Sequence, residues 1–170
     1  MVVAAVFLLG AAAWLWRHDV RQQRLAVALV DHLTADTTAV GGGLARPSHF
    51  MSVIFHNGSG QPLTLLSLGG DLDGARLQAV DVLDAAAPPE DEHAVRRSSP
   101  PIRLVHPLVV RPGGTAEVDF EYVITDCHAA ARAPGSIPVV ARARGREVRT
   151  SVRPSGSPPG WGWLGMAIRC

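Results

Sequence analysis

Hydrophobic and polar positions follow two different periods along the chain, and the change falls near residue 47. Before it, apolar side chains recur at helical spacing, most clearly at Leu25, Leu29 and Leu33, in a segment without Gly or Pro. Three glycines at positions 41–43 then end the helical pattern. After residue 47 the period becomes two, which is typical of β-strands. The pattern predicts a helix followed by a β domain.

The helical part begins with sixteen residues that hold no charged side chain. At about 1.5 Å per residue this segment spans roughly 24 Å, against roughly 30 Å for a hydrocarbon core. We predict an uncleaved membrane anchor at residues 1–16, with Trp14, Trp16 and Arg17 at the membrane interface, and a helical stalk at 17–40. A cleaved signal peptide and a buried helix are the alternatives.

The arginines that follow the apolar segment leave its orientation open. Arg17, Arg21 and Arg24 favour the cytoplasmic side under the positive-inside rule, whereas an Arg-rich segment before Met1 would reverse that argument. We expect a single-pass protein of the plasma membrane with an extracytoplasmic domain. A Gly-rich linker at 41–47 would join the stalk to that domain.

Short strands are predicted throughout residues 48–154. They cover 48–57, 63–68, 75–83, 102–110 and 115–125, and a final hairpin at 137–152 turns at Gly145-Arg146. The segment 75–83 has a short helix as its alternative, and Pro107 makes 102–110 an edge strand or two short ones. Short strands without helices between them predict an antiparallel immunoglobulin-like β-sandwich of about seven strands, with a small barrel as the alternative.

Strand 115–125 shows the clearest alternation of the chain. Its inward-facing side chains are expected to be apolar: Val118, Phe120, Tyr122 and Ile124. Its outward-facing side chains are expected to be acidic and solvated: Glu117, Asp119 and Glu121. One face of this strand is therefore expected to line the core.

The charge balance excludes one class of partner. The formal net charge is +1, which gives no electrostatic basis for nucleic-acid binding. All sixteen basic residues are arginine and Asn57 is the only asparagine, a bias that a GC-rich genome explains. The arginines of segment 137–152 alternate with apolar positions and are expected on a solvated face.

Several motifs occur in an order that resembles a known group of proteins. These are "F…V.F.N.G..PL.L", then "L.V.PGG.A.V.F.Y.ITDC", and finally "V.AR.RGRE", between residues 48 and 154. Together they are similar to uncharacterised, membrane-anchored or secreted immunoglobulin-like β-sandwich proteins of actinobacteria. The resemblance implies the fold and an envelope location, and it implies no catalytic residue.

The two cysteines, Cys127 and Cys170, are the main chemical question. Cys127 precedes His128, but neighbours on a strand point to opposite faces, so a nucleophile–base pair is not expected and the protein is not expected to be an enzyme. In an exported protein the two cysteines are expected to pair. Such a bond would close a loop of about forty residues and stabilise the fold by roughly 3–4 kcal/mol. Two free thiols and an intermolecular bond are the alternatives.

Metal binding is a weaker hypothesis. It would use His49, Met51, His56 and His128, but no short ligand spacing supports it, and the segment 71–74 is better explained as a turn than as a calcium loop. No cofactor is expected.

Residues 155–170 form a Pro/Gly linker and a Trp-rich tail. The tail holds five large apolar side chains: Trp161, Trp163, Leu164, Met166 and Ile168. It is expected to dock on the domain, with a membrane interface or a protein partner as alternatives. The sequence as a whole predicts a non-catalytic, membrane-anchored binding or assembly module of the bacterial cell envelope with a protein partner. The alternative is an extracytoplasmic copper, zinc or redox protein.

Overall fold

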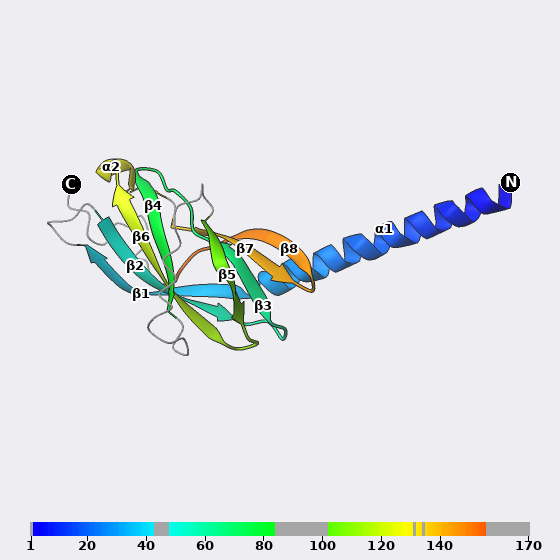
Figure 1. The fold of residues 1–170 in the computed structure, drawn as a ribbon, viewed down its shortest axis with the longest axis horizontal. Coiled ribbons are helices and arrows are strands. Elements are labelled where there is room, and N and C mark those ends of the chain that lie inside the picture. The colour runs from blue at the N-terminus through cyan, green and yellow to red at the C-terminus, as the bar shows by residue number, and fades with distance from the viewer. Residues whose placement is uncertain (1, 43–47, 84–101, 131, 134, 156–170) are drawn as a thin grey trace.

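The computed structural model shows a long helix that projects from a β-sandwich (Figure 1). It describes residues 2–42, 48–83, 102–130, 132–133 and 135–155. Helix α1 (Val2–Val30) comes first, and the short helix α2 (Cys127–Ala130) follows the sixth strand. The strands are β1 (Leu33–Gly42), β2 (Ser48–Asn57), β3 (Leu63–Leu68), β4 (Ala75–Leu83), β5 (Ile102–Val110), β6 (Thr115–Ile124), β7 (Ile137–Ala143) and β8 (Arg146–Val152).

The strands form two four-stranded antiparallel sheets. One has the order β1-β2-β6-β4 and the other the order β5-β3-β7-β8. When β5 is set aside, the other seven strands, lettered A to G in chain order, give the ABED and CFG sheets of an immunoglobulin constant-type domain. β5 is an additional edge strand beside β3, and an edge position tolerates Pro107, which has no N–H to donate.

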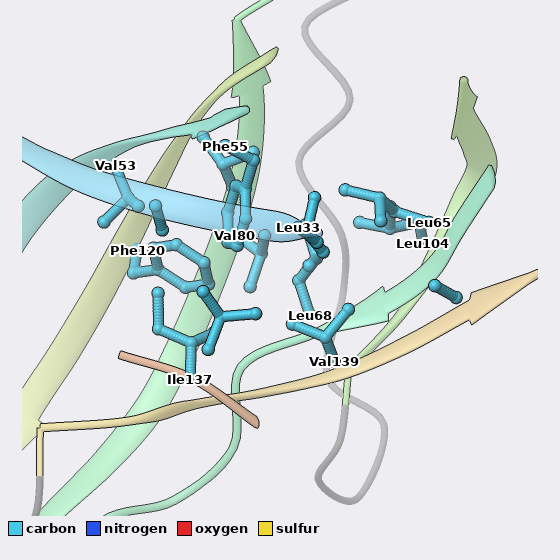
Figure 2. Packing of buried hydrophobic residues seen from close by; sticks show 14 of the residues in the cluster. Leu33, Val53, Phe55, Leu65, Leu68, Val80, Leu104, Phe120, Ile137 and Val139 are labelled. Atoms are coloured by element: carbon cyan, nitrogen blue, oxygen red, sulfur yellow. The ribbon is translucent and has the colours of Figure 1, made fainter. Parts of the chain in front are cut away.

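The core lies between the two sheets. Figure 2 shows side chains of both sheets meeting there: Leu33, Val53, Phe55, Val80 and Phe120 from one sheet and Leu65, Leu68, Leu104, Ile137 and Val139 from the other. The inward prediction for β6 is confirmed, since Val118, Phe120 and Tyr122 are fully buried and Ile124 is partly buried. The rings of Phe55 and Phe120 meet edge to face at 6.5 Å.

The predicted helical stalk is wrong beyond Val30, where α1 ends. Residues 33–42 form β1, which pairs with β2 from Leu33↔Asn57 to Gly42↔His49, so the sandwich begins at Leu33 and the predicted linker begins inside a strand. A bulge between Thr37 and Ala39 breaks the alternation of β1, and this concealed the strand in the sequence. Residues 43–47 of the predicted linker lie outside the described residues.

The turn between β7 and β8 is one residue earlier than predicted. Ala143 pairs with Arg146, so the two turn residues are Arg144 and Gly145, with φ angles of 51° and 74°. A two-residue turn with positive φ at both positions is type I′, whose twist matches that of the flanking strands. The turn therefore requires positive φ at both central positions, and Gly145, which adopts positive φ without steric cost, occupies the second.

Helix α1 is docked at one end and exposed at the other. Ala26 and Val30 are buried in the core cluster, and α1 packs against β7 and β8. Towards the N-terminus, Trp14, Leu15 and Trp16 are 64, 59 and 70% exposed. Among the described residues, no helix has both the length and the apolar character needed to cross a membrane. The predicted membrane crossing at residues 1–16 is therefore not shown.

Docking of α1 predicts that two nearby alanines, Ala26 and Ala28, differ in how much stability is lost when each is replaced by glutamate. Ala26→Glu is expected to lower the free energy of unfolding by about 2–4 kcal/mol, because a carboxylate must be buried or the helix must leave the sandwich. Ala28 is exposed, so Ala28→Glu is expected to change it by less than about 0.5 kcal/mol. Urea unfolding followed by circular dichroism measures both, and equal midpoints would contradict the docking.

Candidate functional sites

Cys127 is the first residue of α2, directly after β6. The preceding Asp126 caps this helix, with its Oδ1 accepting a hydrogen bond from the Ala129 N–H at 3.0 Å. Cys127 is disulfide-bonded, so its sulfur is no free thiolate and cannot serve as a nucleophile. The predicted partner, Cys170, lies outside the described residues, and the pairing stays a prediction. His128 is exposed on α2.

The turn at residues 71–74 supports the junction between β6 and α2. The carbonyl of Gly74 accepts hydrogen bonds from the N–H groups of Thr125 and Asp126, at 2.8 and 3.0 Å. Leu72 and Ala75 exchange two backbone hydrogen bonds, which close the turn. The segment is therefore a tight turn, in agreement with the turn interpretation of its sequence.

The cap on α2 predicts a pH dependence. The hydrogen bond from the Ala129 N–H is the main cause that holds the pKa of Asp126 below its ordinary value of 3.8. A lowered folded-state pKa contributes stability fully above the ordinary value, and this contribution is lost as the pH falls through the folded-state value. We expect the hydrogen-exchange protection of the Ala129 amide to fall below about pH 4. Asp126→Asn keeps an acceptor without the charge, so its protection should be independent of pH, and an equally flat wild-type profile would contradict the prediction.

The predicted metal residues do not come together. His49 and His56 lie seven residues apart on β2, roughly 23 Å, and on opposite faces. Met51 is fully buried in the core, whereas His128 is exposed on α2 at the end of the sheet where β2 begins. The described residues hold no group of three His, Cys, Asp or Glu side chains suited to a metal ion. The four-residue site predicted from the sequence is therefore not formed.

His56 has a different partner, Asp36 of β1, which the sequence analysis had placed in the stalk. His56 Nε2 lies 2.9 Å from Asp36 Oδ2, and the hydroxyl of Ser155 donates to Asp36 Oδ1. The Ser155 N–H also donates to the Ala35 carbonyl at 2.8 Å, which forms a parallel bridge at the edge of β1. The His56–Asp36 pair is about half exposed and therefore weak. The contacts of Ser155 with Ala35 and Asp36 hold the chain after β8 against the edge of the opposite sheet.

The outer face of the β1-β2-β6-β4 sheet combines an aromatic side chain with carboxylates. Phe50 is 49% exposed and lies opposite Gly41 of β1 and Glu121 of β6. Asp119 lies on the same face and accepts a 2.5 Å hydrogen bond from Ser52. Asp81 of β4 lies opposite Asp119 in the strand register. These residues together are named the Phe50 face: Phe50, Asp81, Glu117, Asp119 and Glu121. The four carboxylates lie on β6 and β4, to one side of Phe50, and Arg76 of β4 is exposed at the edge of the same face.

The predicted interface residues of α1 are all exposed. The Trp14 ring stacks on the His18 ring with centroids 5.5 Å apart, and Arg17 lies between them in the sequence. Asp19 forms an ion pair with Arg146 of β8, a contact between distant segments that the sequence analysis missed. The predicted interaction residues of the tail, Trp161, Trp163, Leu164, Met166 and Ile168, lie outside the described residues.

Asn57 is a structural residue whose role the sequence analysis missed. Its side chain is fully buried, and Nδ2 donates to the carbonyls of Gln61 and Val110, both at 2.9 Å. Its Oδ1 accepts from the Ser59 N–H and Ser59 Oγ at 3.0 and 2.7 Å. The turn motif "NGSG" was the available signal, but the contact with Val110 depends on the tertiary fold.

Comparison with known proteins finds no matching family model and no matching curated protein. Among solved structures, the chain is similar to the apo PmoF2 PCuAC domain, with a TM-score of 0.36 and 13% identity over 72% of this chain and 85% of that one. It is also similar to the copper-bound PCuAC domain from PmoF2, with a TM-score of 0.29 and 14% identity over 72% and 87%.

A third similar structure is an exo-β-N-acetylglucosaminidase from Vibrio harveyi in complex with N-acetylglucosamine. Its TM-score is 0.33, with 10% identity over 73% of this chain and 18% of that enzyme. Likenesses at these TM-scores do not define a shared fold; the strand order of the two sheets defines this one.

Proposed function

We propose that the protein is a non-catalytic binding module of the cell envelope, held at a membrane by α1. The observation that carries this proposal is the division of α1 into a docked end and an exposed end. Ala26 and Val30 are buried against the sandwich, whereas Trp14, Leu15 and Trp16 contact mainly solvent. Residues 2–16 of the same helix contain no charged side chain. Exposed apolar side chains such as those of Trp14, Leu15 and Trp16 are costly in water and stable in lipid.

A lipid bilayer accounts for this helix better than a protein groove. Tryptophan side chains concentrate at membrane–water interfaces, and Trp14 and Trp16 lie where the uncharged segment meets Arg17. Residues 2–16 reach roughly 22 Å as a helix, which is enough to embed in the apolar layer. The sandwich would then lie outside the membrane, on the extracytoplasmic side, where the disulfide at Cys127 is stable.

The binding role is supported by the Phe50 face. An exposed aromatic side chain next to charged groups is typical of interaction surfaces, and the four carboxylates of β6 and β4 favour a basic partner. The absence of catalysis is supported by the disulfide bond of Cys127, which engages the strongest nucleophile of the described residues. We infer a protein partner in the envelope that presents arginine or lysine to this face.

Fractionation of cells that express the full chain tests the membrane attachment. The wild-type chain is expected in the membrane pellet after extraction with alkaline carbonate. Leu8→Arg places a charge in the uncharged segment and is expected to shift the chain to the soluble fraction. Leu25→Arg is the matched control, because Leu25 is exposed and lies outside that segment. A soluble wild-type chain, or equal behaviour of the two variants, would contradict the attachment.

Binding of a basic peptide tests the Phe50 face separately. An Arg-rich peptide is expected to bind the full chain. Its affinity should fall as the salt concentration rises, because salt screens exposed charges. Phe50→Ser is expected to weaken this binding, whereas Val109→Ser, an exposed site on the opposite sheet, should leave it unchanged. A Phe50→Ser variant that binds like the wild type would exclude this face.

A metal-binding role is a second candidate function. His49 and His128 lie at the same end of one sheet, and imidazole ligands suit copper. One similar structure is described as a copper-bound domain, but this describes that protein, and its TM-score of 0.29 lends the idea no weight. Stoichiometric copper binding that His49→Ala and His128→Ala abolish and His106→Ala preserves would favour this function. The primary proposal predicts no such binding.

A further inference from the structure

The β7–β8 hairpin lies beside α1. Arg146, directly after the turn, forms its ion pair with Asp19, which is three residues from Trp16. Three residues correspond to an axial rise of about 4.5 Å along a helix. Arg144, in the turn itself, is exposed. The Arg146 guanidinium therefore meets α1 about one helical turn from Trp16.

Helix α1 carries further positive charge at this height. Arg17, Arg21 and Arg24 are exposed, and at 100° per residue they lie on the side of the helix away from Asp19. All three lie within about 12 Å of axial rise from Trp16. Asp19 is already paired with Arg146, so little negative charge remains to balance them. The five arginines at this level are named the arginine collar: Arg17, Arg21, Arg24, Arg144 and Arg146.

We propose that the arginine collar binds the headgroups of anionic phospholipids. This inference rests on the proposed membrane attachment, which places Trp14 and Trp16 at the interface and the collar in the headgroup layer. A guanidinium group presents paired N–H donors that match phosphate oxygens. The collar is concentrated within roughly a Debye length of the interface, although the chain as a whole has a net charge of only +1. Contact through both α1 and the β7–β8 turn fixes the orientation of the sandwich on the membrane.

Binding of the full chain to vesicles tests the collar. The probes are vesicles of phosphatidylcholine alone and vesicles that contain 30% phosphatidylglycerol, at low and high salt. The wild-type chain is expected to bind both and to prefer the anionic vesicles at low salt. Arg21→Gln and Arg144→Asn are each expected to reduce this preference about five-fold. Asn-Gly is a favoured type I′ pair, so Arg144→Asn should leave the turn intact.

Arg149→Gln is the matched control, because it removes the same charge from an exposed position on β8 away from the turn. It should leave the preference for anionic vesicles unchanged. Equal binding to both vesicles, or equal loss in Arg149→Gln and Arg144→Asn, would overturn the collar and leave the membrane attachment intact. Binding to anionic vesicles alone would instead contradict the attachment through residues 2–16. Failure to bind either vesicle would contradict both.

Discussion

Gly74→Ala is expected to lower the free energy of unfolding by about 3–5 kcal/mol. Gly74 has a φ angle of +73°, which by itself costs an L-residue roughly 1 kcal/mol. A Cβ at this position would also lie 2.1 Å from the Asp126 carbonyl oxygen and 2.5 Å from the Ala130 nitrogen. Both are backbone atoms of the β6–α2 junction, so the junction must move and lose its hydrogen bonds to Gly74.

Gly113→Ala separates the cost of the positive φ angle from the cost of the steric clash. Gly113 also has a positive φ angle, +66°, but nothing lies within 4 Å of the added Cβ. This variant is expected to lose only about 1 kcal/mol. Urea unfolding of both variants measures the difference, and similar losses would show that Gly74 is not packed against α2.

Asn57→Asp is expected to have the second large effect, lowering the free energy of unfolding by about 2–4 kcal/mol at neutral pH. The change preserves an acceptor for Ser59 but replaces the Nδ2 donor with an oxygen that faces the carbonyls of Gln61 and Val110. A buried carboxylate without donors on one side is strongly unfavourable. Burial and the two carbonyls raise the folded-state pKa of the introduced carboxyl. The loss of stability relative to the wild type should therefore be largest above this pKa and should shrink as the pH falls through it.

Urea unfolding at pH 7 and pH 4.5 measures this effect. Ser59→Ala is the control, because it removes the Ser59 hydroxyl but leaves the Asn57 donors in place, and it should cost about 1 kcal/mol at both pH values. An Asn57→Asp variant with the stability of the wild type at pH 7 would show that Asn57 does not hold the turn to the end of β5.

Strands with regular alternation could be predicted from the sequence, because alternation and β-branched residues report one buried face directly. The bounds of β2, β3, β4 and β5 agree with the predicted segments, and the buried side chains of β6 are those expected. β1 could not be predicted, because its bulge breaks the period and Leu33 also fits the helical stripe. The turn at Arg144 required the strand register, which the sequence leaves ambiguous by one residue.

The candidate sites were harder to predict than the strands. The membrane interface predicted for α1 rests on the absence of charge along residues 1–16, which is visible in the sequence alone, and it stays a prediction. The pairs Asp19–Arg146 and Asp36–His56 join segments that are far apart in the chain, so only the tertiary fold brings them together. The metal set failed for a different reason: His49 and His56, seven residues apart on one strand, point to opposite faces, and Met51 is buried in the core.

Labelling of intact cells with a membrane-impermeant maleimide tests the central claim that α1 holds an extracytoplasmic, disulfide-bonded sandwich at the membrane. The chain is expected in the membrane fraction, and it should react in intact cells only after treatment with an impermeant reductant, because Cys127 is disulfide-bonded. Reaction only after the cells are lysed, or recovery of the chain in the soluble fraction, would contradict this account.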